Sequence, residues 1–149
     1  MADTTAPAGK TPWHLWVVGI LSLLWNIVGV VDYTMTQTGN EAYLKGLTSD
    51  QLEYLDSFPI WVVVAWGIAV WGGLLGSTLI LLRRSAALHL FVASLVGMVL
   101  TNIYSHILSD GREIMGGGAG AVIFNAVIFV IGVLLLLYSR SMCKRGALR

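Results

Sequence analysis

The chain has 149 residues, of which 56% are hydrophobic and only 11% are charged, and its mean hydropathy is +0.78. A soluble domain carries about 25% charged residues, so this composition cannot cover a water-facing surface and indicates that lipid is the main solvent. The formal net charge of +1 argues against a nucleic-acid partner, because phosphate binding needs a concentrated basic face. The single cysteine, Cys143, excludes an internal disulfide, a CxxC redox pair and a thiolate zinc site.

Four apolar stretches are long enough to cross a bilayer as helices, which takes about 20 residues each. They run over residues 13–36, 59–82, 85–108 and 117–138. We therefore predict an all-α fold, an integral membrane four-helix bundle that occupies residues 13–140. Residues 1–12 are predicted to be a cytoplasmic N-terminal tail, and residues 141–149 a basic cytoplasmic tail.

The basic residues are shared unevenly between the two sides of this predicted bundle. Most of the nine Lys and Arg residues fall on one side, and only Lys45 and Arg112 fall on the other. Because basic connections are retained in the cytoplasm, we predict that both termini are cytoplasmic and that the chain is a multi-pass protein of a bacterial inner (plasma) membrane. The basic side contains Lys10, Arg83, Arg84, Arg140, Lys144, Arg145 and Arg149.

The longest connection, residues 37–58, contains one predicted short helix. Thr48 or Ser49 can cap a helix over residues 50–57, in which two leucines give an apolar side. We expect this helix to lie on the outer membrane surface with its apolar side toward the headgroups. The alternative is a partial lid over the bundle.

Small residues recur at three- and four-residue steps along the predicted spans, which is the spacing of one helix face. In lipid, helices associate through such close contacts and through a few hydrogen bonds. The same faces suit contacts with another membrane protein or with a second copy of the chain. The predicted packing positions are Gly19, Gly29, Ala69, Gly73, Gly97 and Gly132.

Polar residues inside the predicted spans are candidates for a functional site, because burying them in lipid is costly. Four fall in the outer half of the membrane and Asn26 falls near its middle; the set is Asp32, Asn26, Asn102, His106 and Asn125. Together they predict a polar patch that binds a polar ligand or an ion, or that relays a proton through His106 and Asp32. The alternative is structural, because asparagines that face a bundle often join helices. Asp32 and His106 are too few ligands for a metal site, so neither a metal nor another cofactor is predicted.

Three segments carry a resemblance to a known group of proteins. They are Trp25-Asn26-x-x-Gly29, Pro59-x-Trp61, and the run from Gly72-Gly73 to Gly76 that ends in Arg83-Arg84. Together these segments resemble small four-span bacterial inner-membrane proteins with no established activity, some of which are labelled sugar transporters. The resemblance covers most of the chain, and it assigns no functional residue.

Two hypotheses for function stay open at this point. The first is a non-enzymatic accessory or interaction subunit of a larger membrane complex, because packing faces are abundant and no nucleophile–base pair or metal shell supports an enzyme. The second is a small oligomeric transporter or binding protein for a polar solute that uses the polar patch. Both place the chain in the lipid bilayer, with another membrane protein or further copies of itself as partner.

Overall fold

The computed structural model describes residues 11–149, so most of the predicted N-terminal tail, including Lys10, lies outside the described residues. Within the described part the chain is helical, and four helices are long and apolar enough to cross a membrane. This confirms the predicted all-α class, and four helices that could cross a membrane suggest a multi-pass membrane protein. The four are α1 (Trp13–Gln37), α4 (Ile60–Leu81), α5 (Ala87–Ile103) continued by the π-helical turn η1 (Tyr104–Leu108), and α7 (Ala119–Lys144).

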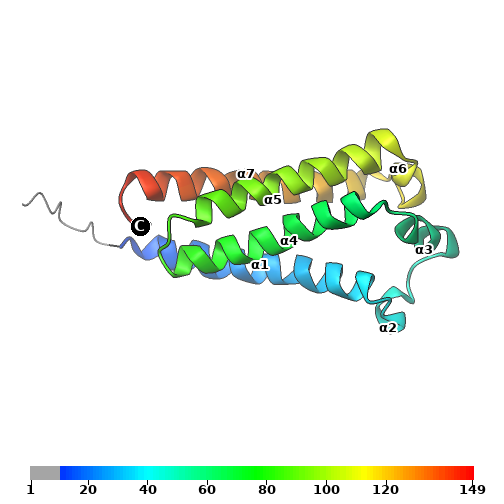
Figure 1. Ribbon diagram of the computed structural model, residues 1–149, viewed down its shortest axis with the longest axis horizontal. Coiled ribbons are helices and arrows are strands. Elements are labelled where there is room, and N and C mark those ends of the chain that lie inside the picture. The colour runs from blue at the N-terminus through cyan, green and yellow to red at the C-terminus, as the bar shows by residue number, and fades with distance from the viewer. Residues whose placement is uncertain (1–10) are drawn as a thin grey trace, which may run out of the picture.

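Three short helices gather at one end of the molecule, which we call the loop end (Figure 1). The start of α1, the α4–α5 turn and the end of α7 lie at the opposite end, which we call the terminal end. The short helices are α2 (Glu41–Leu44), α3 (Ser49–Asp56) and α6 (Gly111–Ile114).

Helix α3 occupies the segment for which a short helix was predicted. Thr48 caps it: the Thr48 hydroxyl accepts a hydrogen bond from the Gln51 amide at 3.3 Å, and Gln51 Oε1 accepts from the Thr48 amide at 3.1 Å. Its Tyr54 is buried, and the Tyr54 hydroxyl lies 2.8 Å from Ser109 Oγ. Since α3 also contacts α6, it is held against the loop end of the protein by specific contacts.

The closest approach between spans joins α4 to α5. Gly97 on α5 lies against the backbone of Ala65 and Ala69 on α4, where a side chain would overlap backbone atoms. Ser94 Oγ donates to the Ala69 carbonyl oxygen at 2.5 Å, which satisfies a buried hydroxyl at the same contact. Small residues thus let two backbones meet, which is the role that the sequence pattern predicts for them.

The other predicted packing glycines lie at contacts with neighbouring spans. α4 packs on α1 as well as on α5, and α7 packs on α5. Gly19 and Gly29 on α1 face α4, Gly73 on α4 faces Asn26 on α1, and Gly132 on α7 faces α5.

The terminal end is closed by an apolar cluster to which the end of the chain contributes. Helix α7 runs to Lys144, beyond the predicted limit at residue 138, and Gly146, with a φ of 67°, turns the chain back. Arg149 then pairs with the α4–α5 turn through backbone hydrogen bonds to Arg83 and from Ser85, each 2.8 Å long. The predicted basic tail, residues 141–149, is therefore partly helical and partly packed. The cluster contains Leu15, Ile80, Ala87, Phe91, Leu135, Met142, Ala147 and Leu148.

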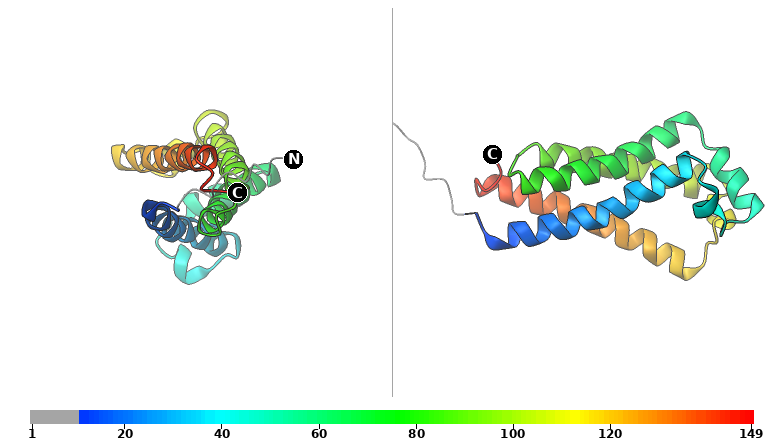
Figure 2. Two further views of the ribbon diagram at one scale, coloured as in Figure 1. Left: turned by 90° about the vertical axis from the view of Figure 1, so that its left-hand side faces the viewer. Right: turned by 90° about the horizontal axis from the view of Figure 1, so that it is seen from below.

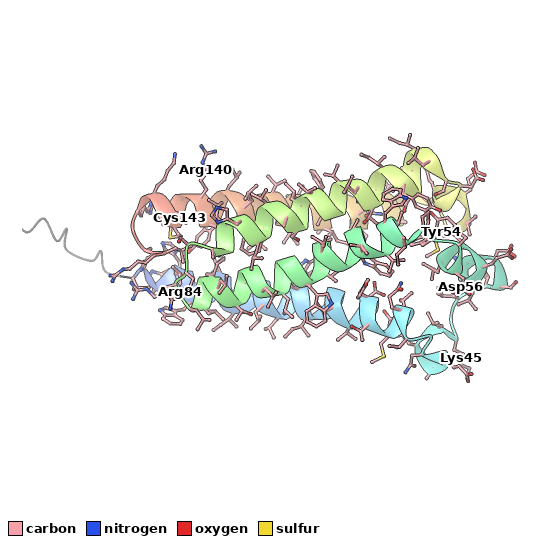
Figure 3. All side chains as sticks on the ribbon, in the orientation of Figure 1. Lys45, Tyr54, Asp56, Arg84, Arg140 and Cys143 are labelled. Carbon is pink, nitrogen blue, oxygen red and sulfur yellow. The ribbon has the colours of Figure 1, made fainter. Side chains whose placement is uncertain are left out.

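Of the described basic residues used to predict orientation, Arg84 and Arg140 are labelled at this terminal end in Figure 3. Lys45, also labelled, lies at the loop end. Arg83 adopts a φ of 58° in the tight α4–α5 turn, and its Nε donates to the Ala147 carbonyl oxygen at 3.4 Å. Lys144 and Arg145 end α7, and Arg149 pairs with the α4–α5 turn.

Helices α1 and α7 meet near the terminal end only, where His14 Nδ1 lies 2.6 Å from the Tyr138 hydroxyl. Toward the loop end α7 diverges from α1 (Figure 2), and every residue from 119 to 127 is exposed. The predicted bundle is therefore open along its α1–α7 side. A physical reason is that the loop-end half of α7 is apolar except for Asn125, so lipid solvates most of its surface as well as a neighbouring helix does.

Candidate functional site

Two adjoining cavities occupy the region where α1 and α7 diverge. The first has a volume of about 450 Å³ and is lined in part by α3 and α6; we call it the loop-end cavity. The second has a volume of about 460 Å³ and lies deeper, among α1, α4, α5 and α7; we call it the mid-span cavity. Asp32 and Tyr43 line both cavities, so they stand at the boundary between them.

Asp32 is positioned by the turn that follows α1. Gly39, with a φ of 63°, reverses the chain after α1, and Asn40 caps α2 by accepting a hydrogen bond from the Tyr43 amide at 3.0 Å. This brings Tyr43 back over the last turns of α1, where its hydroxyl donates to Asp32 Oδ1 at 2.6 Å. That hydrogen bond is the main cause that raises the pKa of Tyr43 to about 12. Asp32 Oδ2 accepts no hydrogen bond from any described residue, so it is free to bind a ligand.

The loop-end cavity is lined by side chains of opposite charge from two different helices. Asp32 comes from α1, whereas the exposed Arg112 comes from α6. No hydrogen bond among the described residues joins their side chains. Other polar groups also line the cavity, and these are Thr36, Thr101, Ser105, His106 and Asn125. The cavity therefore offers both a hydrogen-bond acceptor with negative charge and a donor with positive charge.

Asn26 takes part in the contact between α1 and α4. Its amide nitrogen donates to the Ser22 carbonyl oxygen at 2.8 Å and to Ser77 Oγ at 3.2 Å, and its oxygen rests against Gly73. Asn26 also lines the mid-span cavity, but both of its donor hydrogens are already directed to protein oxygens. The geometry agrees with the structural alternative for this residue.

Asn102 lies apart from Asp32. Its amide nitrogen donates to the Met98 carbonyl oxygen on its own helix at 2.9 Å, and it lines a separate shallow recess between α5 and α7. His106 Nδ1 lies 3.2 Å from the Asn102 carbonyl oxygen. His106 and Asn125 line both this recess and the loop-end cavity. The five predicted patch residues therefore do not converge: the structure brings Asp32, His106 and Asn125 to one cavity and leaves the other two outside it.

Sequence reasoning missed the partners that complete the cavity walls. Tyr43 and Arg112 fall in connections that carried no motif, although Gly39-Asn40 is a recognisable signal for a chain reversal. An aromatic cluster was also missed, in which rings pack edge-to-face with centroids 5.0 to 6.4 Å apart; it contains Tyr33, Tyr54, Phe58, Trp66 and Tyr104. Three of these rings, Tyr54, Phe58 and Trp66, line the loop-end cavity.

Residues 11–149 contain no group of three or more His, Cys, Asp or Glu side chains that would hold a metal ion. Asp32 and Arg112 offer the loop-end cavity hydrogen-bonding groups and charge. Comparison of the chain with protein-family models, with curated proteins and with solved structures gave no match.

Proposed function

We propose that this chain is a non-enzymatic binding protein of the bacterial inner membrane, with both termini in the cytoplasm and a ligand held in the cleft between α1 and α7. The observation that carries the proposal is the pair of adjoining cavities that share Asp32 and Tyr43. Volumes of about 450 and 460 Å³ fall in the range of about 300–1,000 Å³ that small-molecule sites occupy. The asymmetric distribution of basic residues supports the orientation.

The polar groups of the loop-end cavity supply specificity in this proposal. A carboxylate in a partly apolar setting binds a hydrogen-bond donor more strongly than the same carboxylate in water. Tyr43 occupies Oδ1 and so orients the carboxylate, which leaves Oδ2 for the ligand. Transport across the membrane would need more than one copy, since the terminal end of the cleft is closed by the apolar cluster around Leu15 and Leu148.

The test is extraction of the tagged native chain in a mild detergent, followed by mass spectrometry of every protein and small molecule that co-purifies. We expect a small molecule in a fixed ratio to the chain. Asp32→Asn should lose it, because the amide nitrogen places donors where the carboxylate accepted them. Asp56→Asn is the matched control, since Asp56 is exposed at the loop end and lines neither cavity (Figure 3). If the native chain retains nothing, or if both variants retain the molecule equally, the proposal fails.

The second candidate is the accessory subunit, and a specific observation favours it as well. The loop-end half of α7 is exposed on all sides over residues 119–127, and it contains the polar Asn125. A partner helix that supplied a polar side chain would satisfy that amide. In the same extraction, a protein partner at fixed stoichiometry and an empty cleft would favour this candidate over the first.

A further inference from the structure

The mid-span cavity differs in chemistry from the loop-end cavity that it adjoins. Its walls are mostly apolar, with Trp25 from α1, Phe91 and Met98 from α5, and Phe124 and Ile128 from α7. Its side chains also reach the surface between the two diverging helices: Val28 is 68% exposed and Phe124 is 60% exposed. In a bilayer this opening faces lipid, so an apolar chain can enter it from the side without crossing water.

The occupant therefore has to be apolar at membrane depth and polar at the loop end. A transmembrane helix does not fit in the deeper part, because a cylinder of about 10 Å diameter fills roughly 420 Å³ per turn. The mid-span cavity, at about 460 Å³, would hold only about one such turn. A soluble polar molecule would leave the apolar cavity empty. An acyl chain joined to a polar head matches both parts.

The charged side chains of the loop-end cavity indicate which polar head the bound lipid carries. Arg112, from α6, presents the planar donor fork that binds phosphate oxygens. Asp32, from α1, presents Oδ2, a free acceptor for an N–H donor. A head that carries phosphate at one end and a primary ammonium at the other satisfies both side chains. An anionic head without an amine meets repulsion from Asp32, and a trimethylammonium head has no N–H to donate.

We propose that the cleft binds a zwitterionic phospholipid with a phosphoethanolamine head, its phosphate at Arg112, its ammonium at Asp32 and one acyl chain in the mid-span cavity. This inference rests on the proposed binding function and names its ligand class. The lipid enters sideways between α1 and α7 from the leaflet at the loop end.

The test uses the purified full chain, stripped of lipid in detergent, and native mass spectrometry with dioleoyl lipids that differ only in the head. The chain should bind phosphatidylethanolamine in preference to phosphatidylglycerol and phosphatidylcholine. Asp32→Asn and Arg112→Gln should each weaken binding about tenfold, because each removes one charge-assisted hydrogen bond. Asp56→Asn and Lys45→Gln are matched controls at the loop end and should leave binding unchanged, since neither residue lines a described cavity.

A second pair of variants tests the acyl chain. Ile128→Trp fills the mid-span cavity and should abolish lipid retention, whereas Ile123→Trp places the same bulk on an exposed face of α7 that lines no described cavity. Equal binding of all three lipids, or no effect of Ile128→Trp in a variant that folds like the native chain, overturns the inference. If the native extraction yields a soluble molecule that depends on Asp32 while phosphatidylethanolamine shows no preference, the lipid inference fails and the binding function stands. If neither a lipid nor a soluble molecule binds, both fail.

Discussion

Replacing Gly97 by alanine tests whether α4 and α5 are held together by direct backbone packing. The new Cβ would overlap the carbonyl oxygen of Ala65 and lie 2.9 Å from the amide nitrogen of Ala69. Both atoms belong to the α4 backbone and cannot rotate away, so the two helices have to separate. Separation also stretches the hydrogen bond from Ser94 Oγ to the Ala69 carbonyl oxygen.

The expected loss in the free energy of unfolding follows from these contacts. Overpacking a close contact costs about 1–3 kcal/mol, and a hydrogen bond between membrane helices contributes about 0.6 kcal/mol on average. Alanine favours a helix over glycine by about 0.5–1 kcal/mol, which offsets part of the loss. We therefore expect Gly97→Ala to lower the free energy of unfolding by about 1–3 kcal/mol.

The assay is unfolding in mixed micelles, with increasing sodium dodecyl sulfate in a mild detergent, followed by circular dichroism. Gly120→Ala is the control, because no described atom lies within 4 Å of the position its Cβ would take. The control should be as stable as the native chain or more stable by up to about 1 kcal/mol, from helix propensity alone. Equal unfolding midpoints for the two variants would show that α4 and α5 do not meet at Gly97.

Three further predictions address the loop end, the terminal end and the orientation. Tyr43→Phe should lower the free energy of unfolding at neutral pH, because it removes the hydrogen bond to Asp32 that raises the pKa of Tyr43. The difference from the native chain should be fully present below about pH 10 and lost as the pH rises through about 12. Unfolding midpoints measured across that range, with a phenolate absorbance titration, check it. Leu148→Ala should cost about 2–5 kcal/mol in the same unfolding assay, since the side chain is buried, whereas Leu137→Ala, on an exposed face of α7, should cost far less. Cys143, the single cysteine, should resist a membrane-impermeant maleimide in intact cells and react after permeabilisation; labelling from outside would reverse the proposed orientation.

Hydropathy was enough to predict where the spans lie, because length and apolar character alone decide whether a helix can cross a bilayer. The short helix α3 was also predictable, since Thr48 and Gln51 form a local capping pattern that needs no tertiary contact. The packing of the chain after the end of α7 was not predictable in this way. Ala147 and Leu148 are only two apolar residues in a basic segment, and their burial depends on the turn at Gly146 and on a groove made by other helices.

The candidate site was harder to predict, because it depends on which helices are neighbours. Asn26 and Asp32 sit on the same helix, yet Ser77 on α4 occupies the amide of Asn26 while α2 folds over Asp32. These two different surroundings depend on the crossing of α1 over α4 and on the chain reversal at Gly39, neither of which can be read from the sequence of α1 alone. Small-residue spacing also picks out positions that lie between helices, Gly132 of α7 among them, but it does not show that the loop-end half of α7 is exposed.

Asn125 is the polar residue in the exposed loop-end half of α7. It lies about 9 Å along the helix axis from Ala119, the first residue of α7, so it sits within the membrane if α7 spans it. Its side chain is exposed and makes no hydrogen bond to any described residue, and an unsatisfied polar group in hydrocarbon costs several kcal/mol. The helix is therefore not at its lowest free energy when that face meets acyl chains alone. A phospholipid head in the loop-end cavity, which Asn125 lines, would supply the missing acceptor and donor, and it would do so without drawing α7 back onto α1. Under the lipid proposal, the exposed amide and the open side of the bundle share one explanation, which is an occupant of the cleft that is not protein; a partner helix that satisfied Asn125 would instead support the accessory-subunit candidate.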